Sequence, residues 1–371
     1  LALIAMILGP HRIGDYFTET DFYGAYAQGA RLIQHGQFVP ARYGVIGPGY
    51  EVALAGVGFV VRDLFLAAEL LSLLSTLAAL LLWFDLLRGR TGSRIALIAL
   101  LILALNPFVF RYGYAASTDA FAFAFDSLAL WLLLARRGRA ALAVAGLVAG
   151  LAFLTRYSAL ALLPAAWIVI ARGGAGGTRS QSAAEGPPAD DAAPPPRRML
   201  DALLFTAGFL APVVPWVLYS LRHGGGFSFQ LHHNIAYEVF ARSRGMVWDE
   251  YQKTLQPQFH NLWDVIRRDP PAVFGRMAFN VFDHLRLDGQ RLLGWPVALA
   301  ALAGSLLLRA EPGPGGRTLD RALAPVLVAG ALLFLSLVPA FYSERYSLPL
   351  VPVYAALAAV GFGSPRFAFA L

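Results

Sequence analysis

The first residue equipped for chemistry is an aspartate near the start of the chain, set among aromatic side chains. Asp21 precedes Phe22 in a polar segment that covers residues 9–50. A carboxylate in such a place can act as a general base toward an attacking hydroxyl, and aromatic rings can stack on a sugar. Four further side chains of the segment are candidates for binding a sugar or an acceptor: Tyr23, Tyr43, Tyr50 and Glu51. Capping of the helix that follows is a second interpretation of Asp21.

Three arginines can supply positive charge to an anionic substrate. Arg111, Arg156 and Arg345 each lie at the end of an apolar stretch, and the guanidinium fork suits a phosphate. Two carboxylates, Asp119 and Glu344, are candidates for contacting a sugar or an acceptor. Two other interpretations stay open. The arginines can pair with these carboxylates or extend to the membrane surface, and Asp119 can cap a helix.

The histidines gather in one part of the chain without the spacing of a metal site. His232 and His233 are adjacent, and no HExxH pattern is present. We therefore expect no metal site built by the protein and no certain cofactor, while a divalent cation that assists a phosphate stays open. The chain has no cysteine, which excludes a disulfide framework. It also has no GxxxxGKS loop, so nothing indicates a nucleotide-sugar donor bound in the cytoplasm.

The composition indicates the surroundings in which these residues act. Hydrophobic residues make up 57% of the 371 residues, whereas charged residues make up only 14%, against roughly 25% in a typical soluble domain. Apolar runs recur along the chain, and several reach the roughly 20 residues that cross a bilayer. We therefore expect an all-α polytopic membrane protein, a bundle of about nine to eleven transmembrane segments with juxtamembrane helices on its extracytoplasmic side.

The apolar runs divide a single domain, residues 1–371, into its expected parts. Residues 1–8 are interpreted as a truncated first helix and residues 9–50 as an outer catalytic loop. A short apolar stretch at 51–61 precedes the expected spans, which cover 64–87, 95–110, 118–135, 200–221, 292–308, 322–341 and 348–363. Residues 140–171 are too long for one span and contain LTRYS, which predicts two short helices meeting at 155–158. Residues 172–198, rich in Gly, Pro, Ala and Ser, predict a disordered cytoplasmic linker.

The outer region 222–290 is polar overall but contains two helical patterns. In QFHNLWDVIRR the apolar residues at helical spacing are Phe259, Leu262, Trp263 and Ile266. In FGRMAFNVFDHL they are Phe274, Met277, Ala278 and Val281. Both patterns predict amphipathic helices that lie on the outer membrane surface or cover the bundle. A packed lid without chemistry is the simpler interpretation of this region.

The basic residues predict how the chain is oriented in the membrane. The net charge is +7, and the only lysine is Lys253. Because the arginines cluster between apolar segments, a lipid bilayer explains them better than a nucleic acid partner. The clusters lie within 88–94, 136–139, 172–198 and 309–321, and alternating spans bring all four to one side, which the positive-inside rule makes cytoplasmic. Asp21, Asp119, LTRYS, region 222–290 and YSERYS then share the extracytoplasmic side, where we expect the active site.

Four segments resemble, in order, segments of the glycosyltransferase C superfamily. TDFYGAYAQGARLIQHG followed by GPGYE resembles its first extracytoplasmic loop, and NPFVFRYGYAASTDAFAFAF resembles its second outer turn. AGLVAGLAFLTRYSALALLP resembles its GLAFLTK-type stretch, and YSERYSLPLVPVYAAL resembles its late RY-x-LP-x-xP segment. The members that they resemble are polyprenyl-phosphate-dependent enzymes related to protein mannosyltransferases and lipid A aminoarabinose transferases. Two positions depart from the pattern, since Phe22 follows Asp21 where many relatives have a second acidic residue, and Arg156 replaces the usual lysine.

This resemblance implies a glycosyltransferase of the cell membrane. A sugar carried on a polyprenyl phosphate would pass to a hydroxyl of a glycan, lipid or protein acceptor, and Asp21 matches the catalytic aspartate. The leaving phosphate would need the cations named above. The alternative is a polytopic transporter or lipid flippase without glycosyl transfer, although the sequence shows no convincing internal repeat. A purely structural membrane subunit is a third possibility, and it would not need the acidic, aromatic outer loop.

Overall fold

The computed structural model describes residues 1–12, 19–43, 47–136, 138–173, 195–225, 231–311, 313 and 318–364. The helices of the first half are α1 Ala2–Leu8, α2 Ala27–Gln34, α3 Gly49–Gly58, α4 Leu64–Thr91, α5 Ser93–Leu105, α6 Pro107–Tyr112, α7 Thr118–Ala135, α8 Arg139–Thr155 and α9 Leu162–Ala171. Those of the second half are α10 Pro195–Arg222, α11 Leu231–Ala236, α12 Trp248–Thr254, α13 Leu262–Arg268, α14 Pro270–Leu287, α15 Trp295–Leu307, α16 Leu319–Leu337, α17 Glu344–Ser347 and α18 Val351–Gly363. The all-α class predicted from the sequence is confirmed.

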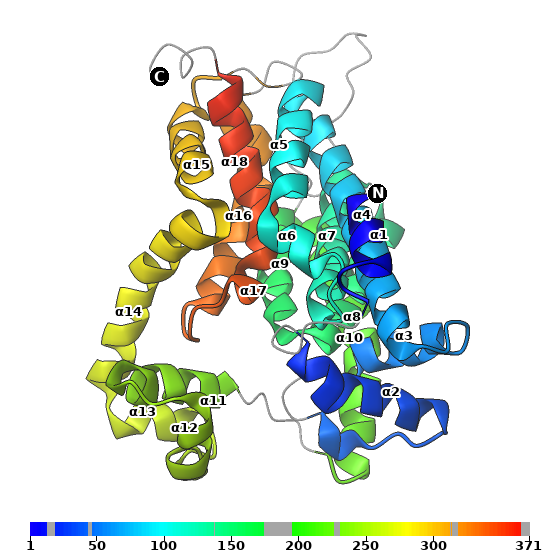
Figure 1. Ribbon diagram of the computed structural model, residues 1–371. Helices are drawn as coiled ribbons and strands as arrows, with labels where there is room; N and C mark the ends of the chain where they lie inside the picture. Colours follow the sequence, from blue (N-terminus) through cyan, green and yellow to red (C-terminus); the bar gives the residue numbers. More distant parts are fainter. Residues whose placement is uncertain are drawn as a thin grey trace.

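The long apolar helices lie side by side in a bundle, which makes this a multi-pass membrane protein (Figure 1). Among the described residues, the segments long and apolar enough to cross a bilayer are Leu64–Thr91, Thr118–Ala135, Arg197–Arg222, Leu319–Leu337 and Glu344–Gly363. Shorter apolar helices cover Ser93–Leu105, Arg139–Thr155, Tyr157–Ala171 and Trp295–Leu307. The expected number of spans stays a prediction.

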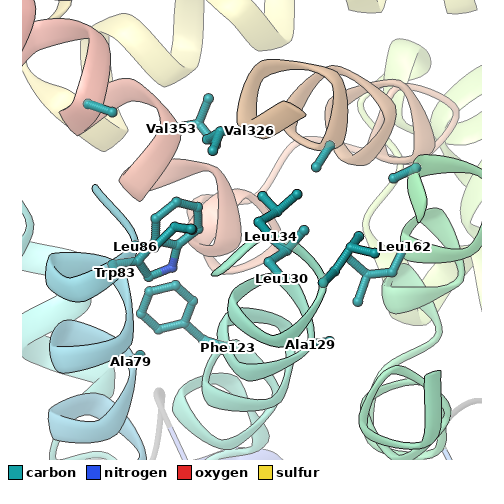
Figure 2. Packing of buried hydrophobic residues seen from close by; sticks show 14 of the residues in the cluster. Ala79, Trp83, Leu86, Phe123, Ala129, Leu130, Leu134, Leu162, Val326 and Val353 are labelled. Carbon is teal, nitrogen blue, oxygen red and sulfur yellow. The ribbon is translucent and has the colours of Figure 1, made fainter. Parts of the chain in front are cut away.

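The bundle is held together by a core of alanine, leucine and aromatic side chains. Figure 2 shows this core where α4, α7, α9, α16 and α18 approach one another. The ring of Trp83 on α4 packs beside that of Phe123 on α7, and Trp83 Nε1 donates to Ser127 Oγ at 2.9 Å. Hydrogen-bonding the indole satisfies a polar group that would be costly to bury unpaired, so α4 and α7 are fixed against each other.

Small residues let several helices approach closely. A side chain on Gly304 of α15 would overlap the carbonyl group of Leu357 on α18, and one on Gly361 of α18 would overlap the carbonyl of Ala300. The same relation joins α8 to α10, where Gly146 faces the backbone of Phe205. In lipid, helices associate through such close packing because lipid tails are as apolar as leucine.

The break predicted between the two halves of residues 140–171 is confirmed. Helix α8 ends at Thr155, and Arg156 is extended at φ −146° and ψ 127°. A short 3₁₀-helix, η3 (Tyr157–Ala161), then leads into α9. The extended residue interrupts helical hydrogen bonding between α8 and η3, and the side chain of Arg156 points to Thr118 and Asp119 at the start of α7.

Most of the described arginine clusters meet at one end of the bundle. Arg90, near the end of α4, donates to the carbonyl oxygen of Leu134 at 2.8 Å and to that of Ala322 at 2.9 Å. This brings together the ends of α4 and α7 and the start of α16. Arg139 Nε lies 3.5 Å from the Asp201 carboxylate, which adds the starts of α8 and α10. The linker predicted for 172–198 lies largely outside the described residues.

The outer region forms a separate small cluster of helices at the other end of the molecule, below one side of the bundle in Figure 1. Its core residues come from α11 to α14 and include Ile235, Tyr251, Phe259, Val265 and Val273. Helix α14 runs from this cluster back to the bundle. The predicted helices therefore exist at 262–268 and 270–287.

The apolar stripe of α14, expected on the outer membrane surface or over the bundle, is not the side of the helix that the protein buries. Phe274 is 60% exposed, and the buried residues are Val273, Asn280, His284 and Leu287. The sequence pattern counted apolar residues only, whereas Asn280 is buried because its Nδ2 donates to the Val338 carbonyl oxygen at 3.0 Å. Exposed aromatic residues on a helix beside a bilayer remain favourable, so apolar periodicity does not identify the protein-facing side there.

Candidate active site

A buried carboxylate lies at the centre of the candidate site. The side chain of Asp119, the second residue of α7, has 0% exposure. Its Oδ2 accepts a hydrogen bond from Arg345 Nε at 2.7 Å. Its Oδ1 lies 2.8 Å from Arg156 Nη2, an ion pair without the alignment of a hydrogen bond. One carboxylate therefore holds two arginines that are far apart in the sequence.

Asp21 joins the same cluster from the first polar segment. Its Oδ2 lies 2.7 Å from Arg345 Nη1, and its side chain is 47% exposed. Asp21 makes no side-chain capping bond to the helix that follows, so the capping interpretation is not supported. Burial, and then the nearby charge of Asp21, raises the pKa of Tyr26 to about 12, which keeps that phenol protonated behind the site at neutral pH.

Local structure explains how Asp119 and Arg156 are presented. The cap of α7 is Ser117, whose Oγ accepts from the Asp119 amide at 3.4 Å, so the Asp119 carboxylate is left for the arginines. Arg156 Nε donates to Thr118 Oγ1 at 3.1 Å. Gly47 allows the outer loop to lie against the end of α8, because any side chain there would overlap the carbonyl group of Leu154.

The cluster opens into a cavity of about 730 Å³. Its charged lining residues are Asp21, Arg156 and Arg345. One wall is apolar and comes from η3, α9 and α16, with Leu160, Ala161, Pro164, Leu332, Leu335 and Leu337. The other lining residues are mostly aromatic or polar and include Tyr157, Asn234, Trp248, Phe341 and Tyr346. Such a space can take a ligand with an apolar chain, an anionic group and a polar head.

The two carboxylates and two guanidinium groups have formal charges that cancel. An anion entering the cavity therefore competes with Asp21 and Asp119 for the arginines. Each guanidinium carries five N–H donors in a fixed fork. Arg345 uses its Nε and Nη1 for the two carboxylates, so its Nη2 group remains as a donor that an anion can use.

Two of the cationic or acidic candidates lie elsewhere. Arg111 is exposed at the end of α6 and is not among the residues that line the cavity. Glu344 precedes Arg345 but lies 3.7 Å from Arg291 Nη1, in a pair that is partly open to solvent. Of the pairings left open by the sequence, those with Asp119 are present, from Arg156 and Arg345, whereas Glu344 pairs with Arg291.

The predicted aromatic and acidic side chains of the outer loop also turn away from the cavity. Tyr23 stacks on Phe65 with a centroid distance of 6.0 Å, and Tyr50 is only 1% exposed. Tyr43 donates its hydroxyl to Glu51 Oε2 at 2.5 Å. Burial raises the pKa of Glu51. These four residues support the loop behind Asp21, and their role in binding a sugar or acceptor stays a prediction.

The sequence did not single out the aromatic side of the cavity. Tyr237 packs on Trp248 at 4.9 Å between centroids, and Trp248 lies 6.2 Å from Phe341. The ring centroids of Phe341 and Tyr346 lie 5.6 Å apart, and Cζ of Arg156 lies 5.5 Å from the ring centroid of Tyr346. Trp248 lies in the outer region, where specificity was expected, but no spacing in the sequence links it to YSERYS.

The part of the chain that the structure describes contains no group of three or more His, Cys, Asp or Glu side chains able to hold a metal ion. The charged groups that line the cavity are Arg156, Arg345 and Asp21. The chemistry available from these residues is proton transfer by a carboxylate and stabilisation of an anion by two guanidinium groups.

Comparison with known proteins finds one matching family model and two similar solved structures. A family model described as dolichyl-phosphate-mannose-protein mannosyltransferase matches residues 48–180. No curated protein matches the chain significantly. The crystal structure of ArnT from Cupriavidus metallidurans bound to undecaprenyl phosphate has a TM-score of 0.60 at 19% identity, covering 93% of this chain and 56% of that one. The apo structure of that ArnT has a TM-score of 0.57 at 18% identity, covering 94% of this chain and 56% of that one.

The chain thus spans little more than half the length of the ArnT chains that it matches. At this identity the structural likeness establishes the fold, while the family model adds a sequence match across α3 to α9 and the start of the linker. Taken together, they show that this chain is similar to the protein mannosyltransferase family over residues 48–180 and to ArnT in fold.

Proposed function

We propose that this protein is a membrane glycosyltransferase that moves a sugar from a polyprenyl phosphate to an acceptor hydroxyl at the outer membrane face. The observation that carries this proposal is one cavity lined by Asp21, Arg156 and Arg345, with an apolar wall from α9 and α16. A polyprenyl-linked sugar needs these same parts: an apolar surface for the chain, cations for the phosphate and a base near the sugar. The ArnT structure with undecaprenyl phosphate is consistent with such a donor.

Asp21 acts as the general base in this proposal. The acceptor hydroxyl attacks the anomeric carbon and forms a new C–O bond, while the bond between that carbon and the phosphate oxygen breaks. The bonding electrons leave with the phosphate, and the hydroxyl proton passes to the Asp21 carboxylate. The half-exposed side chain of Asp21 can reach a bound hydroxyl, unlike the fully buried side chain of Asp119.

Arg156 and Arg345 stabilise the phosphate as it gains negative charge. Donors fixed in advance are most effective at such a place, since they need no reorganisation during the reaction. Asp119 holds both guanidinium groups in position through contacts of 2.8 and 2.7 Å. Asp119 is therefore a positioning residue. Before the donor binds, its negative charge also reduces the repulsion between the two guanidinium groups.

The transporter or flippase alternative predicts a different use of the same cavity. A flippase would move the lipid without breaking the bond between sugar and phosphate, and it would not need a base. The half-exposed Asp21, which lines the cavity beside Arg345, favours transfer over transport.

The test compares purified wild-type protein with Asp21→Asn and Arg156→Ala. Each is given undecaprenyl-phosphate hexoses or pentoses together with a total membrane extract as acceptor, and both sugar transfer and release of undecaprenyl phosphate are measured. We expect Asp21→Asn to lower kcat by about 10² to 10⁴, the usual contribution of a general base. Its affinity for undecaprenyl phosphate should be equal to or higher than that of the wild type, because the amide competes less for Arg345. Arg156→Ala should weaken that affinity.

Asp283→Asn is the matched control, since Asp283 pairs with Arg286 on α14 outside the cavity. It should leave transfer unchanged. Full transfer by Asp21→Asn would remove this residue as the base. Movement of the lipid-linked sugar across proteoliposomes, with no new glycosidic bond in the wild type, would replace the enzyme proposal with the flippase alternative.

A further inference from the structure

Arg345 lies on a segment that cannot hold its own shape. Helix α17 has only four residues, Glu344–Ser347, and η9 (Leu348–Leu350) follows directly. A helix this short forms too few internal hydrogen bonds to be stable alone. A guanidinium that must stay within a few tenths of an ångström of its partners therefore needs support from other elements.

That support comes from Asp288, which lies behind α17 and outside the cavity lining. Asp288 is 1% exposed and begins η7 (Asp288–Leu293), a π-helical turn after α14. Its Oδ1 accepts from the Tyr342 hydroxyl at 3.1 Å and its Oδ2 from the Tyr354 hydroxyl at 2.8 Å. Ser347 at the end of α17 also interacts with this carboxylate. Asp288 thus binds residues on both sides of Arg345.

The element that carries Asp288 is itself anchored. Asn280 on α14 donates to the Val338 carbonyl oxygen at 3.0 Å, just before the segment that leads to Arg345. Asn106 donates to the Leu292 carbonyl oxygen at 2.7 Å, which fixes η7 to the start of α6. A buried carboxylate is costly unless its oxygens are satisfied, and both oxygens of Asp288 are. π-Helical turns within helices are frequent at functional sites.

We propose that Asp288 is a positioning residue that sets the guanidinium of Arg345 for the donor phosphate by clasping Tyr342, Ser347 and Tyr354. The inference rests on the proposed function, because it assigns Arg345 to the phosphate. Asp288 touches neither substrate nor reacting atoms. It determines where α17 lies, and through α17 the direction in which the Arg345 side chain enters the cavity.

The experiment measures affinity for undecaprenyl phosphate in nanodiscs. Asp288→Ala, Asp288→Asn and Tyr354→Phe are each made in the wild-type background and in an Arg345→Ala background, with Asp283→Asn on the adjoining helix α14 as the control. In the wild-type background we expect Asp288→Ala to weaken binding about tenfold and Tyr354→Phe to weaken it about threefold. Asp288→Asn should bind nearly as well as the wild type, because the amide keeps most of the hydrogen bonds that alanine loses. In the Arg345→Ala background these changes should shift affinity less than twofold, since the group that they position is gone.

The outcomes separate the inference from the function beneath it. Equal losses in both backgrounds would make Asp288 a general structural residue and overturn the inference alone. Unchanged affinity for Arg345→Ala would refute the phosphate site, and the inference with it. Should Asp288→Ala fail to fold, Tyr354→Phe decides the matter, because it removes one hydroxyl and leaves the packing of the ring in place.

Discussion

Asp119 has no exposed side-chain surface, yet it contacts two arginines that approach from separate parts of the chain. Burying a carboxylate and two guanidinium groups is expensive in itself, and the expense is offset only while the partners remain together. Breaking such a group leaves uncompensated charge, whereas an exposed pair contributes little. We therefore expect that a substitution which removes the charge of Asp119, but almost none of its volume, strongly lowers the stability of the protein.

Asp119→Asn should lower the free energy of unfolding by about 3 kcal/mol, near the lower end for breaking a buried ion pair, because the arginines also face the cavity. The measurement is unfolding in mixed micelles followed by tryptophan fluorescence. Asp85→Asn is the control, since the side chains of Asp85 and Arg88 are 45% and 55% exposed, and exposed pairs contribute about 1 kcal/mol or less. Equal stability of the two variants would contradict a structural role for Asp119.

At the residue scale, the sequence predicted the cluster better than its surroundings. Asp21, Asp119, Arg156 and Arg345 were expected on one side because alternating spans bring the polar segment of Asp21 and three ends of apolar runs to the same side of the bilayer. Arg111 satisfied the same criterion, but the structure places it outside the cavity lining. Lateral position around a bundle depends on helix packing, which hydropathy does not record.

At the element scale, features that belong to one helix were predicted well, whereas features that depend on packing against other helices were not. The break at Thr155 followed from a run too long for one span with a polar interruption, and the structure has it there. For α14 the apolar spacing predicted the helix but did not identify its buried side, where Asn280 and His284 face the protein while Phe274 is exposed. Length and interruption are visible in one helix, whereas the choice of face depends on partners elsewhere.

Close packing of α15 on α18 is an element-scale feature that can be tested directly. Gly304→Ala would push a methyl group into the Leu357 carbonyl, and overpacking of this kind costs about 1 to 3 kcal/mol. We expect a lower thermal unfolding midpoint in detergent. Gly275→Ala on α14 meets nothing within 4 Å, and it should keep the midpoint or raise it slightly, since alanine favours a helix by about 1 kcal/mol over glycine. A midpoint for Gly304→Ala equal to wild type would contradict the close contact.

At the scale of the whole molecule, the two ends of the bundle differ in chemistry. One end collects Arg90 and Arg139 with the ends of α4, α7, α8, α10 and α16. The other end carries the cavity and the small cluster of α11 to α13. Because arginines in short loops favour the cytoplasm, this separation predicts that the cavity opens on the extracytoplasmic side. A polyprenyl-linked sugar would then meet its acceptor outside the cell membrane.

This orientation can be tested with single cysteines, since the native chain has none and needs no preparatory substitution. Gln37→Cys is exposed next to Phe38, whose ring packs 5.4 Å from that of Trp216 near the end of α10, opposite the Arg139–Asp201 pair. Ser93→Cys is exposed beside Arg94 at the arginine-rich end. A membrane-impermeant maleimide should label Gln37→Cys in intact spheroplasts and Ser93→Cys only after permeabilisation, because the positive end faces the cytoplasm. The reverse labelling pattern would mean that the cavity opens on the cytoplasmic side of the membrane, where an acceptor outside the cell could not reach Asp21.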